Sequence, residues 1–300
     1  MEENYQSKTI HTNGIQLHAI EAGPEDGELV LLLHGFPEFW RGWSKQITPL
    51  ADAGFLVVAP DQRGYNLSEK PSGVDSYHID ILANDILGIL QAYNRKQAFI
   101  VGHDWGAAVA WHIATYYPDM VKKLVILNVP HPAIIIFFLR RSIKQLLKSW
   151  YIFFFQIQRF SEWVLSRNNY QAMRKMMLAS SNPGTFSEQD LAYYKEAWGQ
   201  HGALTGMLNW YRAAFRSAVR NLSKAREMPD VRVHVPTLML WGAKDIALSN
   251  ELVQPSIGLC EDGRVVYYED ATHWVQHDQA SQITQEILDF IKKCNGDTFN

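Results

Sequence analysis

The chain has little cysteine and no excess of basic charge. Only two of its 300 residues, Cys260 and Cys294, are cysteines, too few for a disulfide framework or a zinc cluster. Reduced thiols and a cytoplasmic location are therefore expected. Lys and Arg total 28 against 31 Asp and Glu, a formal net charge of −3, which argues against nucleic acid as a partner. Residues 1–5 are acidic and polar, unlike the start of a secretion signal.

Long apolar runs are also absent from the sequence. The longest one, residues 133–139, ends at Arg140 and Arg141. It is too short to cross a bilayer, which takes about 20 residues, so no integral membrane span is expected. Two interpretations of the run remain open. Together with the nearby cations, including Lys144, it suits peripheral contact of a lid with a membrane surface, or it packs against the rest of the protein.

Apolar strand patterns alternate with helical patterns through the first 130 residues. The pair Asn13-Gly14 is typical of a β-hairpin between residues 9–12 and 15–19, because both residues tolerate positive φ. Wholly apolar segments, as in strands buried on both faces, occur at residues 29–33, 55–59, 98–101 and 124–127. Helical periodicity lies between them, at residues 79–93 and 107–117. This alternation predicts an α/β fold with a mostly parallel central sheet flanked by helices.

The pattern changes after Asn128. Residues 131–230 are rich in aromatic residues, Met, Arg and Lys, and they have helical periodicity without a clear strand. Strand patterns return at residues 237–241 and 264–268, and an amphipathic segment, 283–291, follows. We therefore expect one α/β core, residues 1–130 and 231–300, interrupted by an inserted helical lid, or cap domain, at residues 131–230.

The most informative motif is Gly102-His103-Asp104-Trp105-Gly106, between an apolar strand and a helix. Small residues around a strand-to-helix turn are typical of a nucleophile elbow, which exposes one side chain. Here that side chain is the carboxylate of Asp104, and the sequence contains no Gly-x-Ser-x-Gly. The alternative is a tight turn in which Asp104 merely caps the helix.

Several motifs in the same order resemble the α/β-hydrolase fold, and within it the soluble-type epoxide hydrolases, over essentially the whole chain. His34-Gly35-Phe36-Pro37 is similar to the family's oxyanion-hole motif, and Asp61-Gln62-Arg63-Gly64-Tyr65 is similar to its Asp-x-Arg-Gly turn. The resemblance implies an oxyanion hole made by the backbone N–H groups of Phe36 and Trp105. It also implies that the Phe36–Pro37 peptide bond is cis.

Resemblance also suggests the rest of a catalytic triad. Asp245 lies just after a strand, where the family has its acid, and His273 lies after the last strand, where the family has its His. Asn128, at the other position that some relatives use for the acid, is not ionisable. Two alternatives remain: Asp245 caps a loop, or His273 pairs with His277 at i, i+4 spacing as a metal ligand, although a third ligand is lacking.

The expected lid contains two candidate proton donors. The segments around Tyr151 and Tyr211 are similar to the family's two lid-tyrosine segments, although a lid tyrosine can also simply pack with its hydroxyl in water. Haloalkane dehalogenases use the same kind of Asp nucleophile and a Trp at the position of Trp105. They usually have Asn at the position of Phe36, so this chain departs from their pattern.

The resemblance therefore implies an epoxide hydrolase with an aspartate nucleophile and no metal or other cofactor. Asp104 would form an alkyl ester, Tyr151 and Tyr211 would protonate the epoxide oxygen, and His273 with Asp245 would activate water. The expected substrate is a small apolar epoxide, and the expected state is a monomer or homodimer. A haloalkane-type dehalogenase and a non-catalytic small-ligand receptor remain as alternatives. The expected pocket residues are His34, Pro37, Trp210 and Trp274, with His34 also suited to hydrogen bonding within its turn.

Overall fold

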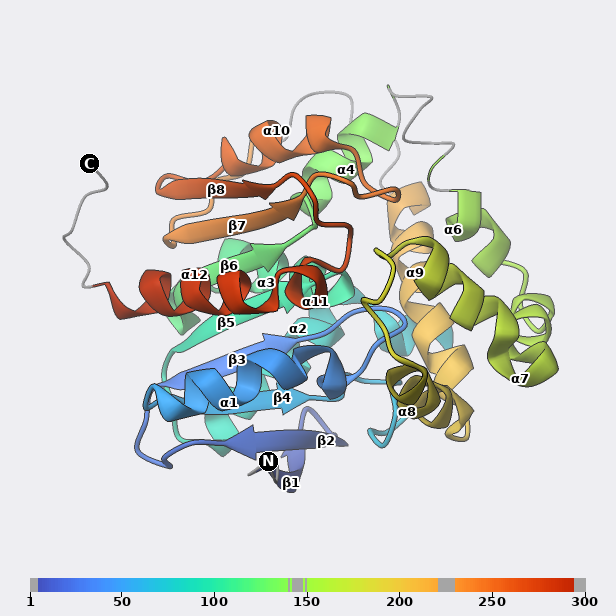
Figure 1. Ribbon diagram of the computed structural model, residues 1–300, viewed down its shortest axis with the longest axis horizontal. Coiled ribbons are helices and arrows are strands. Elements are labelled where there is room, and N and C mark those ends of the chain that lie inside the picture. Colours follow the sequence, from blue (N-terminus) through green and yellow to red (C-terminus); the bar gives the residue numbers. More distant parts are fainter. Residues whose placement is uncertain (1–4, 140, 142–147, 149, 221–229, 294–300) are drawn as a thin grey trace.

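The computed structural model describes residues 5–139, 141, 148, 150–220 and 230–293. One eight-stranded sheet, in the order β1-β2-β4-β3-β5-β6-β7-β8, forms the centre of the molecule (Figure 1). The strands β3 to β8 run parallel, whereas β2 pairs antiparallel with both β1 and β4. The predicted α/β fold is therefore confirmed. The strand bounds are β1 Gln6–Thr12, β2 Ile15–Ala22, β3 Leu29–Leu33, β4 Leu56–Pro60, β5 Ala98–His103, β6 Val121–Leu127, β7 Thr237–Gly242 and β8 Gly263–Tyr268.

The local patterns explain the strands. Thr12 pairs with Ile15 across the predicted turn, in which Asn13 and Gly14 have φ of 46° and 75°. Every residue of β3 is buried, as expected of a strand covered on both faces. Successive side chains of a strand point to opposite faces. Accordingly, Leu31 belongs to the apolar core on one side of the sheet and Leu32 to the core on the other.

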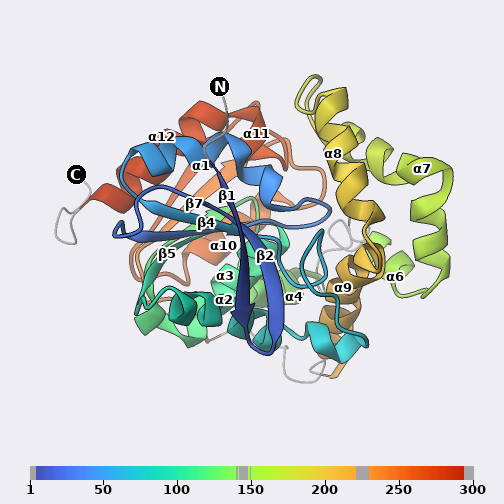
Figure 2. The same ribbon diagram turned by 90° about the horizontal axis from the view of Figure 1, so that it is seen from below.

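Helices cover both faces of the sheet. In the two ribbon views, α1, α11 and α12 lie on one face and α2 and α3 lie on the other (Figures 1 and 2). Both faces are therefore shielded from water, which allows wholly apolar strands. The bounds of these helices, with the short α10 beside β8, are α1 Ser44–Asp52, α2 Ile79–Ala92, α3 Trp105–Tyr116, α10 Val253–Ile257, α11 Val275–Asp278 and α12 Ala280–Lys292.

The described residues between β6 and β7 are mainly helical, and they form no strand. Figure 1 shows α6 to α9 beside the carboxyl ends of the parallel strands, the edge where α/β proteins bind ligands. Within α7, residues 167–170 leave the helical conformation, so this element is two helices joined at a kink. The bounds are α4 Pro132–Leu139, α6 Trp150–Phe155, α7 Phe160–Ala179, α8 Glu188–Gly199 and α9 Ala203–Arg220.

The longest apolar run of the sequence packs inward. It lies in α4, where Ile134 is fully buried against Leu252 and Leu259, with Phe138 beside them. Its residues are not among the exposed large apolar side chains, so the structure supports the packing interpretation and not a membrane patch on this run. Arg140, Lys144 and Cys294 lie outside the described residues. No helix in the described part of the chain has the length and apolar character needed to cross a bilayer.

Candidate active site

Asp104 lies at the sharp turn between β5 and α3, with φ 48° and ψ −122°. This conformation is strained for a non-glycine residue and persists where the surroundings enforce it. Glycines are needed around the turn, because a Cβ on Gly35 would lie 2.3 Å from Oδ1 of Asp104. Likewise, a Cβ on Gly106 would lie 2.1 Å from the carbonyl oxygen of Leu33. The turn therefore presents the Asp104 carboxylate at the end of the strand, where it is mostly buried and 20% of its side chain is exposed.

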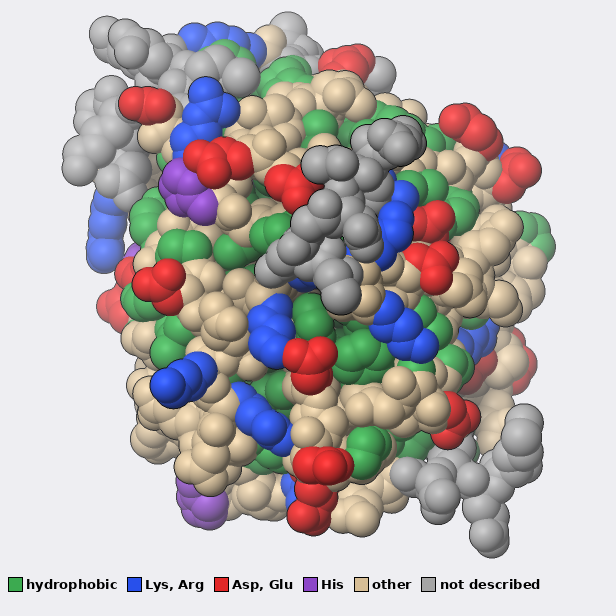
Figure 3. Space-filling view, turned by 90° about the vertical axis from the view of Figure 1, so that its left-hand side faces the viewer, with side chains coloured by type: hydrophobic (Ala, Val, Ile, Leu, Met, Phe, Trp, Pro, Cys, Tyr) green, Lys and Arg blue, Asp and Glu red, His purple; other side chains and the backbone are tan. Residues whose placement is uncertain are grey.

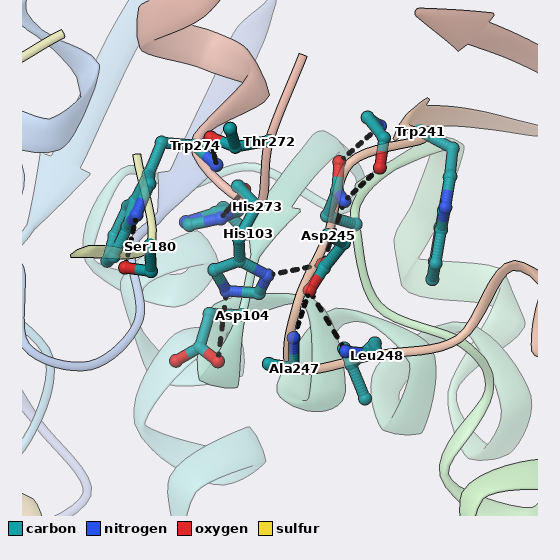
Figure 4. Close-up of polar contacts among 12 residues, drawn as sticks. His103, Asp104, Ser180, Trp241, Asp245, Ala247, Leu248, Thr272, His273 and Trp274 are labelled. Carbon is teal, nitrogen blue, oxygen red and sulfur yellow. Dashed lines mark hydrogen bonds and ion pairs between the residues drawn. The ribbon is translucent and has the colours of Figure 1, made fainter. Parts of the chain in front are cut away.

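The structure brings Asp104, His273 and Asp245 together at the carboxyl ends of β5, β8 and β7 (Figure 4). His273 Nδ1 lies 2.7 Å from Asp245 Oδ2, and His273 Nε2 lies 3.6 Å from Asp104 Oδ2. His277, the alternative metal partner of His273, instead contacts Glu38 through Nε2 at 2.7 Å. The two histidines therefore contact different carboxylates. In the structure His273 lies between Asp104 and Asp245, although it follows both of them in the chain.

Asp245 is held by four hydrogen-bond partners. Besides His273, its carboxylate accepts hydrogen bonds from the backbone N–H groups of Ala247, at 2.7 Å, and Leu248, at 2.9 Å. The amide of Asn128 donates at 2.9 Å, and the Asn128 side-chain oxygen accepts from the N–H of Gly242 at 2.7 Å. Asn128, which sequence reasoning treated only as a non-ionisable position, therefore ties β6 to the loop that carries Asp245.

The three ionisable groups stabilise one another's charged forms. Burial alone would lower the pKa of His273, but the charge of Asp245 and the contacts with both carboxylates raise it to about 10. Burial opposes ionisation of Asp104 and Asp245, yet the interactions with His273 keep the pKa of each carboxyl below its usual value. At neutral pH the free site therefore contains two carboxylates with an imidazolium between them.

The loop after β3 supplies a donor to Asp104. The N–H of Phe36 donates to Asp104 Oδ1 at 2.6 Å, and the Phe36–Pro37 peptide bond is cis, as the resemblance implied. Trp105 is the first residue of α3, and the first N–H groups of a helix lack partners within it. His34 is fully buried, with Nδ1 3.1 Å from the Gly35 carbonyl oxygen and Nε2 accepting from the Gln62 N–H at 3.0 Å. It therefore serves as a hydrogen-bonding part of the turn.

The two lid tyrosines approach this loop from α6 and α9. The rings of Tyr151 and Tyr211 lie 5.9 Å apart between centroids. Tyr211 also packs edge-on against Phe36, at 5.3 Å, and Trp105, at 5.0 Å. Burial, followed by the negative charge of Asp104, raises the pKa of both phenols far above the ordinary value. Both hydroxyls therefore keep their protons at neutral pH.

Of the expected pocket residues, only Trp210 lines the cavity beside the site, and His34, Pro37 and Trp274 do not. The side chains of Asp104, Tyr151, Tyr211 and His273 are not among its lining either. The Pro37 carbonyl accepts from the Trp198 indole at 2.6 Å, and the Trp274 indole donates to the Ser180 hydroxyl at 3.0 Å. Trp210 is buried, with its ring 5.8 Å from that of Trp105. These two indoles border the cavity, whose volume of about 650 Å³ is typical of a small-molecule site. Its other lining side chains are mostly apolar and include Tyr77, Leu82, Ile136 and Phe137, with His112 and His131.

Sequence reasoning missed a further buried carboxylate near the site, Glu38. It accepts hydrogen bonds from the hydroxyl of Tyr194 on α8 at 2.6 Å and from the Gln276 amide at 3.0 Å, besides its contact with His277. Its burial opposes ionisation, but the histidines around it hold the pKa of the carboxyl well below its usual value. His103, 3.4 Å from Glu38, lies 2.9 Å from the carbonyl oxygen of His273 through Nε2. The only signal was a charged residue directly after His34-Gly35-Phe36-Pro37.

Comparison with known proteins agrees with this geometry. Residues 28–280 match the family described as the alpha/beta hydrolase fold. The chain is 45% identical over 283 residues to AB hydrolase superfamily protein YfhM of Bacillus subtilis, an alignment that covers 94% of this chain and 96% of the relative. It is 35% identical over 296 residues to Epoxide hydrolase 1 of Caenorhabditis elegans, covering 97% of this chain and 71% of the relative.

Solved structures give the same result. The crystal structure of a Bacillus megaterium epoxide hydrolase in complex with an inhibitor superposes with a TM-score of 0.86 and 32% identity. That superposition covers 95% of this chain and all of the other. This chain therefore belongs to the α/β-hydrolase fold family and, within it, to the group of epoxide hydrolases.

Proposed function

We propose that this protein hydrolyses apolar epoxides to vicinal diols. The observation that carries the proposal is the grouping of a carboxylate at the elbow, Asp104, with two phenols from the helical segment: Tyr211, which is buried against Phe36 and Trp105, and the half-buried Tyr151 beside it. A carboxylate nucleophile suits attack on saturated carbon. Protonated phenols suit an epoxide, because the leaving alkoxide needs a proton. The apolar cavity beside Trp105 and Trp210 suits an apolar substituent.

In the first step, the Asp104 carboxylate attacks one epoxide carbon. The carbon–oxygen bond on that carbon breaks, and the oxygen takes a proton from Tyr151 or Tyr211. The products of the step are an alkyl ester on Asp104 and a tyrosinate that later regains its proton from water. The alkoxide is more basic than the tyrosinate, so the proton transfer is favourable.

In the second step, His273 removes a proton from water, which attacks the ester carbonyl carbon. Forming the ester removes the Asp104 charge, one of the causes that raise the pKa of His273. The imidazolium therefore loses its proton to solvent more easily at this stage than in the free site, which leaves the neutral imidazole that accepts the proton from water, while Asp245 still orients it. The N–H groups of Phe36 and Trp105 stabilise the oxyanion, worth about 3–4 kcal/mol per donor in other enzymes. Collapse breaks the ester C–O bond, the leaving diol oxygen takes the proton held by His273, and the diol is released. The Asp104 carboxylic acid then gives its proton to solvent, which balances the proton that the tyrosinate takes up and restores the carboxylate.

The test is diol formation from styrene oxide and a bulkier aryl epoxide by the wild type and Asp104→Ala. We expect diol from the wild type and a fall of roughly 10⁴-fold or more in the variant, as for loss of other nucleophiles. A thermal melt of both proteins checks that the variant is folded. Halide release from chloroalkanes without diol formation would instead identify a dehalogenase. Epoxide binding without either reaction would favour a receptor.

A further inference from the structure

The lid carries a group of exposed apolar side chains on α6, on the start of α7 and between them. We call these five residues the aromatic strip. Each is about half exposed or more, at 64%, 50%, 53%, 49% and 52% of the residue's reference surface in chain order. Among the described residues, eleven large apolar side chains are strongly exposed, and five of them are in this short stretch. The members are Trp150, Phe153, Ile157, Phe160 and Trp163.

Three of the five members of the strip are joined by a chain of ring contacts. The half-buried ring of Phe154 lies 6.3 Å from Trp150 and 6.2 Å from Phe160, and Phe160 stacks on Trp163 at 5.8 Å. Single exposed apolar residues are ordinary on a protein surface, whereas a connected group marks a contact site. The end of the molecule opposite the lid differs, because basic and acidic side chains are interspersed on that surface (Figure 3).

The charges next to the strip are mainly positive. Arg159 lies within it and is exposed, and the Arg167 guanidinium lies 4.3 Å from the Trp163 ring centroid. Glu162 is the single acidic residue between positions 148 and 180. Its carboxylate is already bound by the buried guanidinium of Arg212, at 2.7 and 3.0 Å. The face that the strip presents is therefore apolar with a cationic border.

The helix α6 is apolar on its inner side as well. Phe155 is buried, and its ring lies 4.9 Å from Tyr211 and 5.6 Å from Phe36. Phe155 therefore makes the inward contact of α6, and among the strip members Phe153 has a ring contact with α9, to Phe215 at 5.7 Å. Figure 1 shows α6 and α7 at the edge of the molecule, far from the sheet. The strip is thus free to meet a flat surface.

We propose that the aromatic strip, with Arg159 and Arg167, docks the lid on the surface of a bilayer that contains anionic lipids. Trp and Phe side chains enter the boundary between headgroups and acyl chains, and guanidinium groups bind lipid phosphates. A second copy of the chain fits less well. In a two-fold contact through this face the same cations would meet each other, and the nearby carboxylate is already paired. Docking does not depend on the proposed reaction.

The experiment is flotation of the full chain with vesicles, without substrate. One set is pure phosphatidylcholine, and the other is phosphatidylcholine mixed with phosphatidylglycerol. The strip variant combines Trp150→Ser, Phe160→Ser and Trp163→Ser, and the charge variant combines Arg159→Gln and Arg167→Gln. Tyr267→Ser, an exposed aromatic on strand β8 of the core, is the matched control. Single Phe153→Ser and Trp163→Ser variants keep the test valid if the triple variant melts early.

We expect the wild type and Tyr267→Ser to float with the anionic vesicles and to bind pure phosphatidylcholine more weakly. The strip variant should bind about tenfold more weakly or worse. Each lost Arg should weaken binding about fivefold, from about 1 kcal/mol per cation near an anionic surface. Absence of flotation by the wild type overturns the proposal, as does equal binding by the strip variant. A wild-type dimer in sedimentation that the strip variant splits, with no lipid binding by either, also overturns it.

Discussion

On the core side of the candidate active site, Asp245 and His273 are held by hydrogen bonds at the ends of strands. On the lid side, the rings of Tyr151 and Tyr211 pack against other rings, about 5–6 Å apart between centroids. Hydrogen bonds fix an orientation within narrow limits. Ring contacts tolerate a change of neighbour if volume and apolar character are kept. Under the proposed function, the core would therefore set the position of the nucleophile, and the lid would set how much substrate fits above it.

The largest effect is expected when a catalytic residue on the core side of the candidate site is replaced. In His273→Gln the carboxylate and both phenols remain, so alkylation should proceed, but water lacks its base. We expect the steady-state rate to fall roughly 10³-fold or more, as when other catalytic histidines are removed. An alkyl ester on the peptide that contains Asp104 should accumulate in mass spectra after mixing with styrene oxide. Rapid turnover without an adduct would contradict the role assigned to His273.

Removing the phenol hydroxyls of the lid should instead block the formation of the ester. Tyr211→Phe keeps the ring contacts but removes a proton donor, so we expect ring opening to slow by roughly 10²-fold. The double variant with Tyr151→Phe should be nearly inactive and show no burst of ester in rapid-quench experiments. Tyr267→Phe is the matched control, on the core strand β8, and should retain the wild-type rate. An unchanged burst in the double variant would show that the phenols are not the donors.

A smaller effect is expected where core and lid are joined through Glu38. Tyr194→Phe removes the hydrogen bond from α8 to this buried carboxylate, and we expect a loss of about 1.5–3 kcal/mol in the free energy of unfolding. Urea unfolding of the two proteins measures the loss. Phe160→Leu, a change at an exposed lid ring, should have an effect near zero.

The pH dependence of stability tests the charge of Glu38. Its pKa is lower in the folded protein, so the carboxylate stabilises the fold above its unfolded pKa of about 4.5, and this contribution is lost as pH falls below that value. The difference in stability between the wild type and Glu38→Gln should therefore be largest near neutral pH and shrink in acid. A difference that does not change with pH would contradict an ionised Glu38.

Much of the fold could be predicted from local patterns. Wholly apolar segments such as residues 29–33 became buried strands because parallel strands covered by helices need apolar residues on both faces. Asn13-Gly14 formed the predicted hairpin because its conformation is local. The elbow at Asp104 was visible because its glycines are needed within a few residues of the nucleophile.

Other features depend on contacts between distant parts of the chain. The apolar run in α4 was compatible with a membrane surface or with the interior of the protein. Its contact with Leu252 and Leu259 shows that it packs against the protein. Glu38 is separated by more than 150 residues from its partners Tyr194 and His277. No local pattern therefore indicated that its carboxylate would find these hydrogen-bond partners. The bond from Asn128 to Asp245 spans 117 positions and was hidden for the same reason.

The sequence by itself determined the order of strands and helices, the carboxylate at the elbow and the candidates for its partners, because these depend on periodicity and on residues adjacent in the chain. The tertiary structure decided which buried charges meet, how Asn128 and Glu38 support the site, and that Trp150, Phe153 and Trp163 remain exposed while Phe155 turns inward. The physical reason is that burial and electrostatic pairing are set by the folded surroundings of a side chain, and residues far apart in sequence supply those surroundings.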